Sequence, residues 1–243
     1  MSDGGKENVD AKRMSLTGHL AELRKCLIIS IIAIGIGFII SFNFSEEILK
    51  FLTRFINPEN RPTFIFLSPA EALWSNFKVA FFAGIILTLP VVLYEIWRFI
   101  SPGLNEKERR YALPFIILSF ISFCIGLIFC YFVVLRFAMN FLLTYKTTGL
   151  TPMISINYYL DFVIKFMLAF GAIFELPFII VFLTRIGILS PEFLSKNRKY
   201  AILINFIIAA ILTPTPDIFN QLLMAVPLMV LYELGIIGAR IFR

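Results

Sequence analysis

Two short charged stretches border the apolar parts of this sequence, and each of them contains a carboxylate. Residues 19–24 precede the first apolar run and include Glu22, whereas residues 105–110 lie between the second and third runs and include Glu108. If successive apolar runs cross a membrane, both stretches lie on the same side of it. Carboxylates beside a bilayer can bind guanidinium groups through paired, charge-assisted hydrogen bonds, or they can be surface charges matched by neighbouring arginines.

A third carboxylate, Glu175, falls within the fourth apolar run, about 12 Å from its inner end. At that depth a carboxylate costs about 2.5–3.5 kcal/mol to insert unless it meets polar partners. Pro177 removes a backbone donor, so we expect a kink or an added polar contact there. A functional role is the first interpretation, and a protonated acid hydrogen-bonded within the bundle is the alternative. Lys165 is expected to pair with Asp161, and Lys78 to reach the outer interface.

Metal, redox and nucleophilic chemistry find little support in the sequence. His19 is the only histidine, and the three cysteines lie within or beside apolar runs, so no set of metal ligands is expected. Ser119 and Ser122 have no histidine or paired acid at membrane depth to activate them. The sequence has no phosphate-binding glycine loop, so energy must come from outside the polypeptide. We therefore expect neither an enzyme nor a bound cofactor.

The composition identifies an integral membrane protein. Hydrophobic residues make up 59% of the 243 residues, charged residues only 16%, and there are 28 phenylalanines. A soluble domain of this length could not bury so much apolar side chain. The apolar residues come in blocks of about 20, the length of helix that crosses a hydrocarbon core, and the alternation of a β-barrel is absent. The predicted fold class is all-α, a polytopic helical membrane protein.

Six apolar runs are predicted to be transmembrane helices. They cover about 25–44, 73–97, 112–135, 160–183, 200–212 and 218–237. The fifth has only 13 residues, about 20 Å of helix, and the sixth is interrupted by Gln221, Pro227 and Glu233. Short fifth and sixth spans are therefore expected. Four full spans followed by a re-entrant hairpin at 213–217 are the alternative.

Lysine and arginine counts orient the bundle. Fifteen of these residues fall on the side of the N-terminus and five on the opposite side. The positive-inside rule then places both termini in the cytoplasm. These flanking residues account for the net charge of +6, so no nucleic-acid partner is expected. Residues 1–14 are expected to form a disordered tail or leader, and residues 15–243 a single transmembrane domain.

The outer connections are long enough to have structure of their own. Ser45 is predicted to cap a helix with Glu46 and Glu47 in its first turn, and the apolar spacing that follows predicts that this helix lies at the outer interface. Residues 136–145 are expected to continue the third helix beyond the membrane. Both segments would contribute to a cap on the outer face.

Short motifs, in order and spacing, resemble the TatC family, the multispanning subunit of the twin-arginine protein translocase. They are HLAELR at 19–24, SPAE at 68–71, Pro90 with Tyr94, Trp97 and Phe99, SPGL at 101–104, ERR at 108–110, FG at 170–171, FELP at 174–177, RKY at 198–200, TPTPD at 213–217, Gln221, and Pro227 with Tyr232 and Glu233. Each is weak alone, but together they cover nearly everything from Ser15 onwards. Two departures are Leu135-Arg136, where relatives often have a proline, and Arg198-Lys199, where Arg-Arg is common.

The resemblance implies a receptor and translocation core for folded proteins whose signal peptides contain paired arginines. Glu22 and Glu108 match the family's signal-binding glutamates, and two arginines need two carboxylates. The residues expected to support this recognition surface are His19, Leu20, Arg24, Pro102, Leu104, Arg109 and Arg110. Within the membrane, Glu175 and Gln221 are implied as polar docking points for small single-span subunits of the TatA/TatB type.

The same resemblance implies a multi-pass protein of a prokaryotic cytoplasmic membrane, assembled as an oligomer in a larger complex and driven by the proton motive force. A proton-coupled transporter of small solutes, using Glu175, Lys165 and Lys78, is the alternative. It explains charge within the membrane but not the glutamates of the inner segments. The sequence has no internal repeat that would support it.

Overall fold

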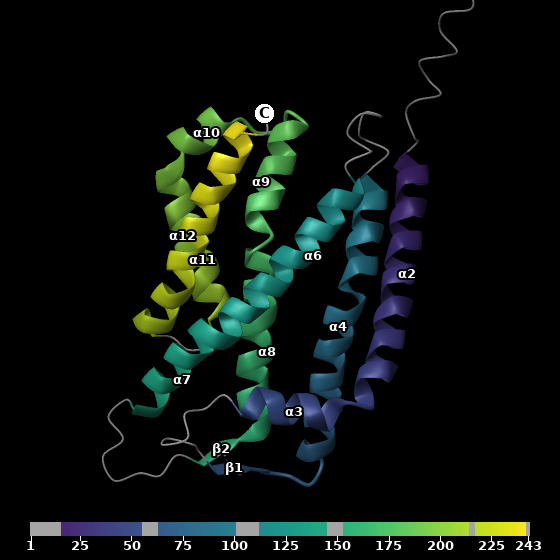
Figure 1. The fold of residues 1–243 in the computed structure, drawn as a ribbon, viewed down its shortest axis with the longest axis vertical. Helices are drawn as coiled ribbons and strands as arrows, with labels where there is room; N and C mark the ends of the chain where they lie inside the picture. Colours follow the sequence, from purple (N-terminus) through teal and green to yellow (C-terminus); the bar gives the residue numbers. More distant parts are fainter. Residues whose placement is uncertain (1–15, 55–62, 101–111, 145–152, 214–216, 242–243) are drawn as a thin grey trace, which may run out of the picture.

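The computed structural model describes residues 16–54, 63–100, 112–144, 153–213 and 217–241, and nearly all of them are helical. The helices run back and forth along one long axis, and shorter elements join them (Figure 1). The first helix begins and the last helix ends at the same end of the molecule, the terminal end, and the opposite end is the distal end. The predicted all-α class is confirmed.

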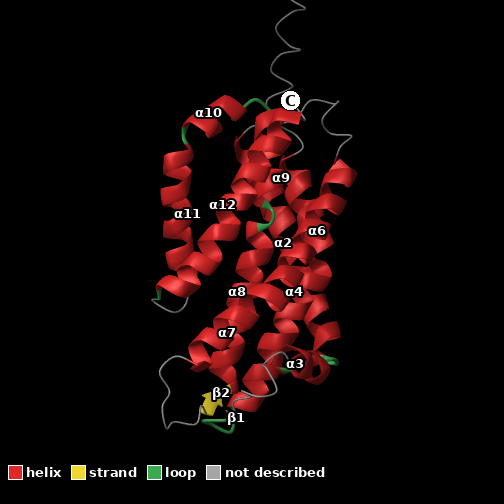
Figure 2. Cartoon of the chain, turned by 60° about the vertical axis from the view of Figure 1, so that its left-hand side comes forward, coloured by secondary structure: helices red, strands yellow, loops and turns green. Residues whose placement is uncertain are grey.

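The bundle follows an up-and-down order. Its first half consists of α2 (Leu16–Phe42), α3 (Ser45–Thr53), α4 (Glu71–Ile100), α6 (Ala112–Phe129), the π-helical turn η3 (Cys130–Val134) and α7 (Leu135–Thr144). The second half consists of α8 (Ile156–Ile173), α9 (Leu176–Arg185), α10 (Pro191–Lys196), α11 (Arg198–Leu212) and α12 (Ile218–Ile241). α3 crosses the distal end, and α10 lies at the terminal end (Figures 1 and 2). Because α6, η3 and α7 are continuous, the expected extension of the third helix is confirmed as far as Thr144.

Within the described residues, five helical stretches are long and apolar enough to cross a bilayer. They are Gly18–Phe42, Glu71–Ile100, Leu113–Leu143, Ile156–Arg185 and Ile218–Ile241. The chain is therefore a multi-pass membrane protein. α11 has only 15 residues, so the expected shortness of the fifth run is confirmed. The expected shortness of the sixth was wrong, because α12 continues through Pro227 for 24 residues; the polar residues interrupt its hydropathy but not its helix.

α2 packs along α4 over most of its length. Their backbones are in close contact at Gly37 and Gly84, where a Cβ atom added to Gly84 would lie 2.7 Å from the backbone nitrogen of Phe38. Towards the terminal end, the rings of His19 and Phe99 stack with their centroids 4.3 Å apart. Lipid is as apolar as the helix surfaces, so close backbone contact at small residues is a main source of helix association in membranes. These two contacts fix the register of the α2–α4 pair.

Segments far apart in the sequence meet at the distal end. β1 (Thr63–Ile65) and β2 (Met153–Ser155) pair as a parallel two-stranded sheet. The buried Glu71 carboxylate accepts hydrogen bonds from the Leu67 backbone N–H and the Ser155 hydroxyl, so it ties two connections at the distal end to the start of α4. This sheet was not predicted, because three-residue strands are too short to show a period of two.

The predicted outer helix is present as α3, but Ser45 does not cap it. Phe44 occupies the N-cap position and makes no side-chain cap hydrogen bond, while Ser45 is buried in the first turn. The cap prediction was wrong because α2 leads into α3 through a tight backbone turn that leaves no room for an extended capping residue. At the other end of α3, the Tyr131 and Tyr159 hydroxyls each donate a 2.7 Å hydrogen bond to a backbone carbonyl, which anchors this helix to η3 and α8.

Gly84→Ala is expected to destabilise the protein, because the added methyl group would press on the backbone of α2 and not on a flexible side chain. Overpacking of this kind costs about 1–3 kcal/mol. Gly35→Ala is the matched control, since nothing lies within 4 Å of a Cβ added at that position of α2. Thermal unfolding of both purified variants in the same detergent measures the difference. Equal melting temperatures would contradict the close backbone contact.

Candidate functional site

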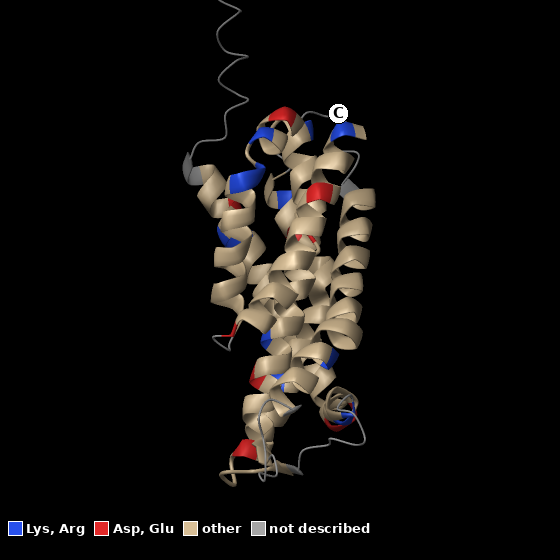
Figure 3. Cartoon of the chain, turned by 90° about the vertical axis from the view of Figure 1, so that its left-hand side faces the viewer, with Lys and Arg blue, Asp and Glu red and all other residues tan. Residues whose placement is uncertain are grey.

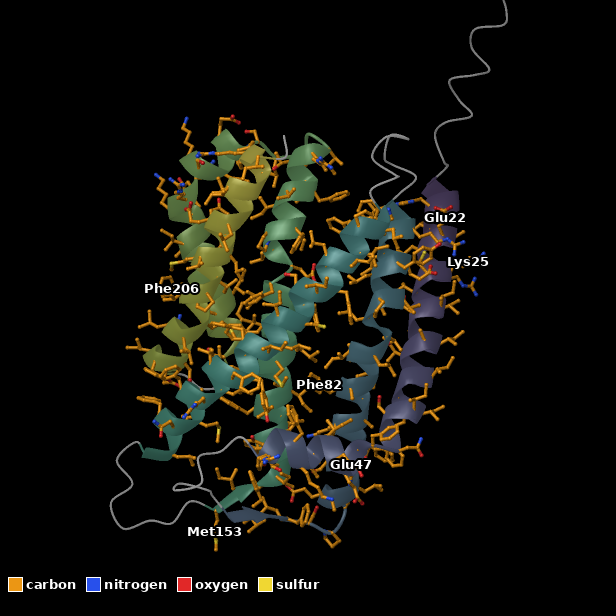
Figure 4. All side chains as sticks on the ribbon, in the orientation of Figure 1. Glu22, Lys25, Glu47, Phe82, Met153 and Phe206 are labelled. Atoms are coloured by element: carbon orange, nitrogen blue, oxygen red, sulfur yellow. The ribbon has the colours of Figure 1, made fainter. Side chains whose placement is uncertain are left out.

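Glu22 lies near the terminal end of α2, whereas Glu47 and Met153 mark the distal end (Figure 4). The Glu22 side chain is half-buried, and its buried Oε2 atom has no hydrogen-bond partner among the described residues. Leu20 and Arg24 are exposed nearby on the same helix. A partly desolvated carboxylate with an available acceptor atom can take a charge-assisted hydrogen bond from a ligand.

The second predicted recognition segment lies outside the described residues. It comprises Glu108 and the supporting residues Pro102, Leu104, Arg109 and Arg110. The helices that this segment joins, α4 and α6, have their adjoining ends at the terminal end, as does Glu22 (Figure 1). Cooperation between Glu22 and Glu108 therefore stays a prediction.

A buried carboxylate that the sequence interpretation missed lies in the last turns of α4. The Glu95 side chain is 5% exposed, and its Oε1 atom lies 3.6 Å from Nη1 of Arg98. Its Oε2 atom has no hydrogen-bond partner among the described residues. On α2, the Cys26 side chain lies beside it. The sequence did contain an indication of this residue, because Glu95 is an acid inside the predicted span 73–97, just as Glu175 is an acid inside the fourth span.

Glu175 lies at the break between α8 and α9, and Pro177 stands in the first turn of α9, so the predicted kink is confirmed. The Ser122 hydroxyl of α6 donates a 2.8 Å hydrogen bond to the Phe174 carbonyl, which is the added polar contact expected at a break. Glu175 itself is half-buried beside Ser119, and its Oε1 atom has no hydrogen-bond partner within the described part of the chain. The break thus presents a carboxylate at membrane depth.

Gln221, the other predicted docking residue, makes a contact within the bundle. Its Nε2 atom donates a 3.2 Å hydrogen bond to the Phe206 carbonyl and so links α12 to α11. The residue is half-buried. Gln221 therefore has a structural role between the last two helices that the sequence did not indicate.

One charge prediction for α8 was wrong. The Nζ atom of Lys78 on α4 lies 2.6 Å from Oδ1 of Asp161 and also donates to Asn157, a pairing that the sequence did not indicate. Asp161 is therefore used between helices and does not pair with Lys165, which is exposed. A pair of residues four apart on one helix is worth only a few tenths of a kcal/mol, so an ammonium shared between two acceptors on a neighbouring helix displaces it.

A second interhelical ion pair joins α11 to α12 near the terminal end. Arg198 donates from Nε to Oε1 of Glu233 at 2.7 Å and from Nη2 to Oε2 at 2.8 Å. Only the planar guanidinium fork can make this bidentate contact. Lys199, which stands where relatives often have a second arginine, takes no part in this pair. Its ammonium lies over the ring of Tyr200 instead.

Within the residues that the structure describes, no group of three or more His, Cys, Asp and Glu side chains could hold a metal ion. All three cysteines are free thiols, with Cys26 and Cys130 buried. The described site chemistry thus consists of carboxylates that can bind cations or hydrogen-bond donors.

Comparison with known proteins agrees with the motifs. The family model described as Sec-independent protein translocase protein (TatC) matches residues 18–227. The chain belongs to the TatC family. The protein named Sec-independent protein translocase protein TatC from Desulforapulum autotrophicum is 45% identical over 235 residues, covering 96% of this chain and 87% of the relative. A relative of the same name from Carboxydothermus hydrogenoformans is 42% identical over 235 residues, covering 97% of this chain and 96% of its own.

The likeness to this family extends to the three-dimensional fold. A solved structure described as the crystal structure of the twin-arginine translocase receptor TatC matches with a TM-score of 0.82 at 41% sequence identity. The match covers 92% of this chain and 99% of that one. The bundle described above is therefore the TatC fold, and the resemblance seen in the motifs is confirmed.

Proposed function

We propose that this chain is the core and signal-peptide receptor subunit of a twin-arginine translocase, which exports folded proteins across a prokaryotic cytoplasmic membrane using the proton motive force. The observation that best supports the receptor role is the half-buried Glu22 carboxylate, which has an acceptor oxygen available for a ligand. It stands within a motif typical of the TatC family. One relative is named as a Sec-independent protein translocase protein, and one similar solved structure is that of a twin-arginine translocase receptor.

We infer six spans with both termini in the cytoplasm, so the terminal end faces the cytoplasm. α11 counts as the fifth span because it is antiparallel to α12 (Figure 2). Its 15 residues give about 22 Å of helix, so the bilayer must thin beside it. The middle of the bundle carries few charges (Figure 3), and fifteen basic residues against five favour this orientation.

In the proposed recognition site, Glu22 and Glu108 bind the two signal arginines. The residues proposed to support them are His19, Leu20, Arg24, Pro102, Leu104, Arg109 and Arg110. The stack of His19 on Phe99 holds the start of α2 against α4, so the Glu22 carboxylate is placed before the peptide arrives. Such preorganisation strengthens binding because less freedom is lost when the ligand binds.

A single-span partner subunit is proposed to pack along α8 and α9. Tyr158, Lys165 and Ala172 are exposed and recur every seven residues along α8, the spacing of a helix face that contacts one neighbouring helix, and Ile179 is exposed on α9 beyond the break. Glu175 lies on these helices at the break and offers the partner a polar contact. Because the receptor site lies near the terminal end, docking here leaves the recognition site accessible.

Gln221 is proposed as a further contact for the TatA/TatB-type subunits, and the complex as an oligomer within the lipid bilayer, built around residues 15–243 as one domain. The protein is proposed to act without enzymatic chemistry, cofactor or nucleic acid. The transporter alternative is less well supported, because Lys78 is held by Asp161 and is not free to bind a solute.

Cysteines introduced near Glu108 and Lys196 are expected to react only with reagents that reach the cytoplasm. Cysteines near Asn60 and Thr148 should react from outside, because the positive-inside rule places the basic segments within the cell. Labelling of intact cells and inverted vesicles measures both. Labelling from outside at residues 105–110 would overturn the orientation and, with it, the recognition site.

Glu22→Ala and Glu108→Ala are each expected to weaken binding of a twin-arginine signal peptide by about 1.5–3 kcal/mol, the value of a hydrogen bond to a charged group. Glu108→Lys should be worse because like charges repel. Peptide titration of the purified protein measures the change. Glu46→Ala removes an exposed carboxylate at the distal end and should bind normally. Unchanged peptide affinity in both Glu22→Ala and Glu108→Ala, with normal expression, would refute the assignment of these glutamates to the recognition site.

Glu175→Ala is expected to abolish transport while signal-peptide binding stays nearly normal, because Glu175 lies at membrane depth and away from the terminal end. Glu175→Gln should retain much of the transport, since an amide can still hydrogen-bond across helices at about 0.6–2 kcal/mol. Export of a reporter protein measures this. If the role is instead proton-linked, Gln should be as inactive as Ala, because an amide cannot titrate. Loss of peptide binding in Glu175→Ala would place the residue in the recognition step.

A further inference from the structure

Glu95 is a buried carboxylate at the terminal end that the recognition site proposed above leaves without a role. The residue is 4% exposed, yet its nearest cationic neighbour, Arg98, is 3.6 Å away from Oε1. That separation is beyond a good hydrogen bond. The second oxygen, Oε2, has no hydrogen-bond partner among the described residues. The Cys26 thiol of α2 shares a hydrogen bond with this side chain, but a thiol is a weak donor. A buried carboxylate with such weak compensation is costly to the folded protein, so its presence requires a reason.

The position of Glu95 relative to Glu22 is set by the α2–α4 pair. The helices are antiparallel, and the His19–Phe99 stack fixes their register near the terminal end. Cys26 lies four residues after Glu22 on α2, and it is beside Glu95 on α4. Four residues are about one helical turn, or about 5–6 Å. Glu95 therefore lies about one turn deeper than Glu22 in the seam between the same two helices.

We propose that Glu95 is a further carboxylate of the recognition site and binds the guanidinium of one signal-peptide arginine in the seam between α2 and α4. The inference rests on the proposed receptor function and adds to Glu22 and Glu108 a deeper binding position. Arg98 is held only weakly, and its side chain is 46% exposed, so it can turn to water when the peptide arginine takes its place. The incoming arginine then supplies the partner that Oε2 lacks.

Burial gives Glu95 a preference that a carboxylate nearer the surface does not have. A guanidinium can bond both oxygens of one carboxylate in a planar fork, and it gives up its water more readily than an ammonium does. A lysine at the same depth would lose more hydration and make a single point contact. Glu22, which is only half-buried, attracts either cation. Glu95 therefore sets the preference for arginine over lysine.

The test compares binding of one signal peptide in four versions, with Arg-Arg, Arg-Lys, Lys-Arg or Lys-Lys at the paired position, to purified full-length protein. The wild type should prefer Arg-Arg to Lys-Lys. In Glu95→Gln, Arg-Arg binding should fall about tenfold to a hundredfold while Lys-Lys binding changes little, so the preference is lost. Glu22→Ala should weaken both peptides by similar factors. Glu46→Gln, at the distal end, is the control and should change neither.

Each outcome bears on a separate claim. If the wild type does not prefer Arg-Arg, the receptor function and this inference both fall. If the wild type prefers Arg-Arg and Glu95→Gln keeps the same ratio, the role of Glu95 is refuted and the receptor function stands. Of the two mixed peptides, only one should lose affinity in Glu95→Gln, and equal losses would refute the assignment of a single arginine.

A second variant keeps the proposal testable if Glu95→Gln does not accumulate in the membrane. Glu95→Asp retains the charge next to Arg98 but withdraws the carboxylate by one methylene group. Its ratio of Arg-Arg to Lys-Lys affinity should lie between those of the wild type and a protein without preference. A wild-type ratio in Glu95→Asp, with normal recovery from the membrane, would refute the proposal.

Discussion

The constraint on which this structure depends is that a charged group in or beside a hydrocarbon layer must have a partner or remain in contact with water. Several charges of the described chain are fully engaged with neighbouring elements. These are Glu71 with Leu67 and Ser155, Lys78 with Asp161 and Asn157, and Arg198 with Glu233. Three carboxylates, Glu22, Glu95 and Glu175, keep an oxygen without a hydrogen-bond partner among the described residues. We propose that the paired charges hold the helices together and that the three carboxylates with an unpartnered oxygen bind ligands or partner helices.

The two proposed steps occupy different places in the bundle. Recognition uses the terminal end of the α2–α4 pair, which the His19–Phe99 stack at that end and the close backbone contact at Gly37 and Gly84 further along the pair hold in fixed register. Partner docking uses the break between α8 and α9, where the helical ladder is already interrupted and Glu175 can face a neighbouring helix. A rigid pair suits binding of a short peptide, whereas an exposed helix face suits association with another span. Binding and assembly can therefore be altered separately.

The sequence predicted what local composition determines and missed what depends on contact between helices. Apolar runs located the helices, Pro177 located the break, and the motifs identified the family, because each is a property of neighbouring residues. The partner of Asp161 was mistaken because Lys78 is distant in sequence, and the Ser45 cap because α2 continues almost directly into α3. Glu95 was overlooked because one acid hardly lowers the hydropathy of a long run. The positions of Glu108 and its neighbours lie outside the described residues and rest on the motif alone.

The central claim is that signal arginines bind at the terminal end of the α2–α4 pair. Photocrosslinking from a signal peptide with a benzophenone residue next to the arginine pair tests it most directly, because the adducts report position without altering the receptor. The account predicts adducts on α2 within residues 19–26 and on α4 within residues 95–100, and their loss when unlabelled Arg-Arg peptide competes. Adducts confined to α8 and α9, or to the distal end, would contradict it.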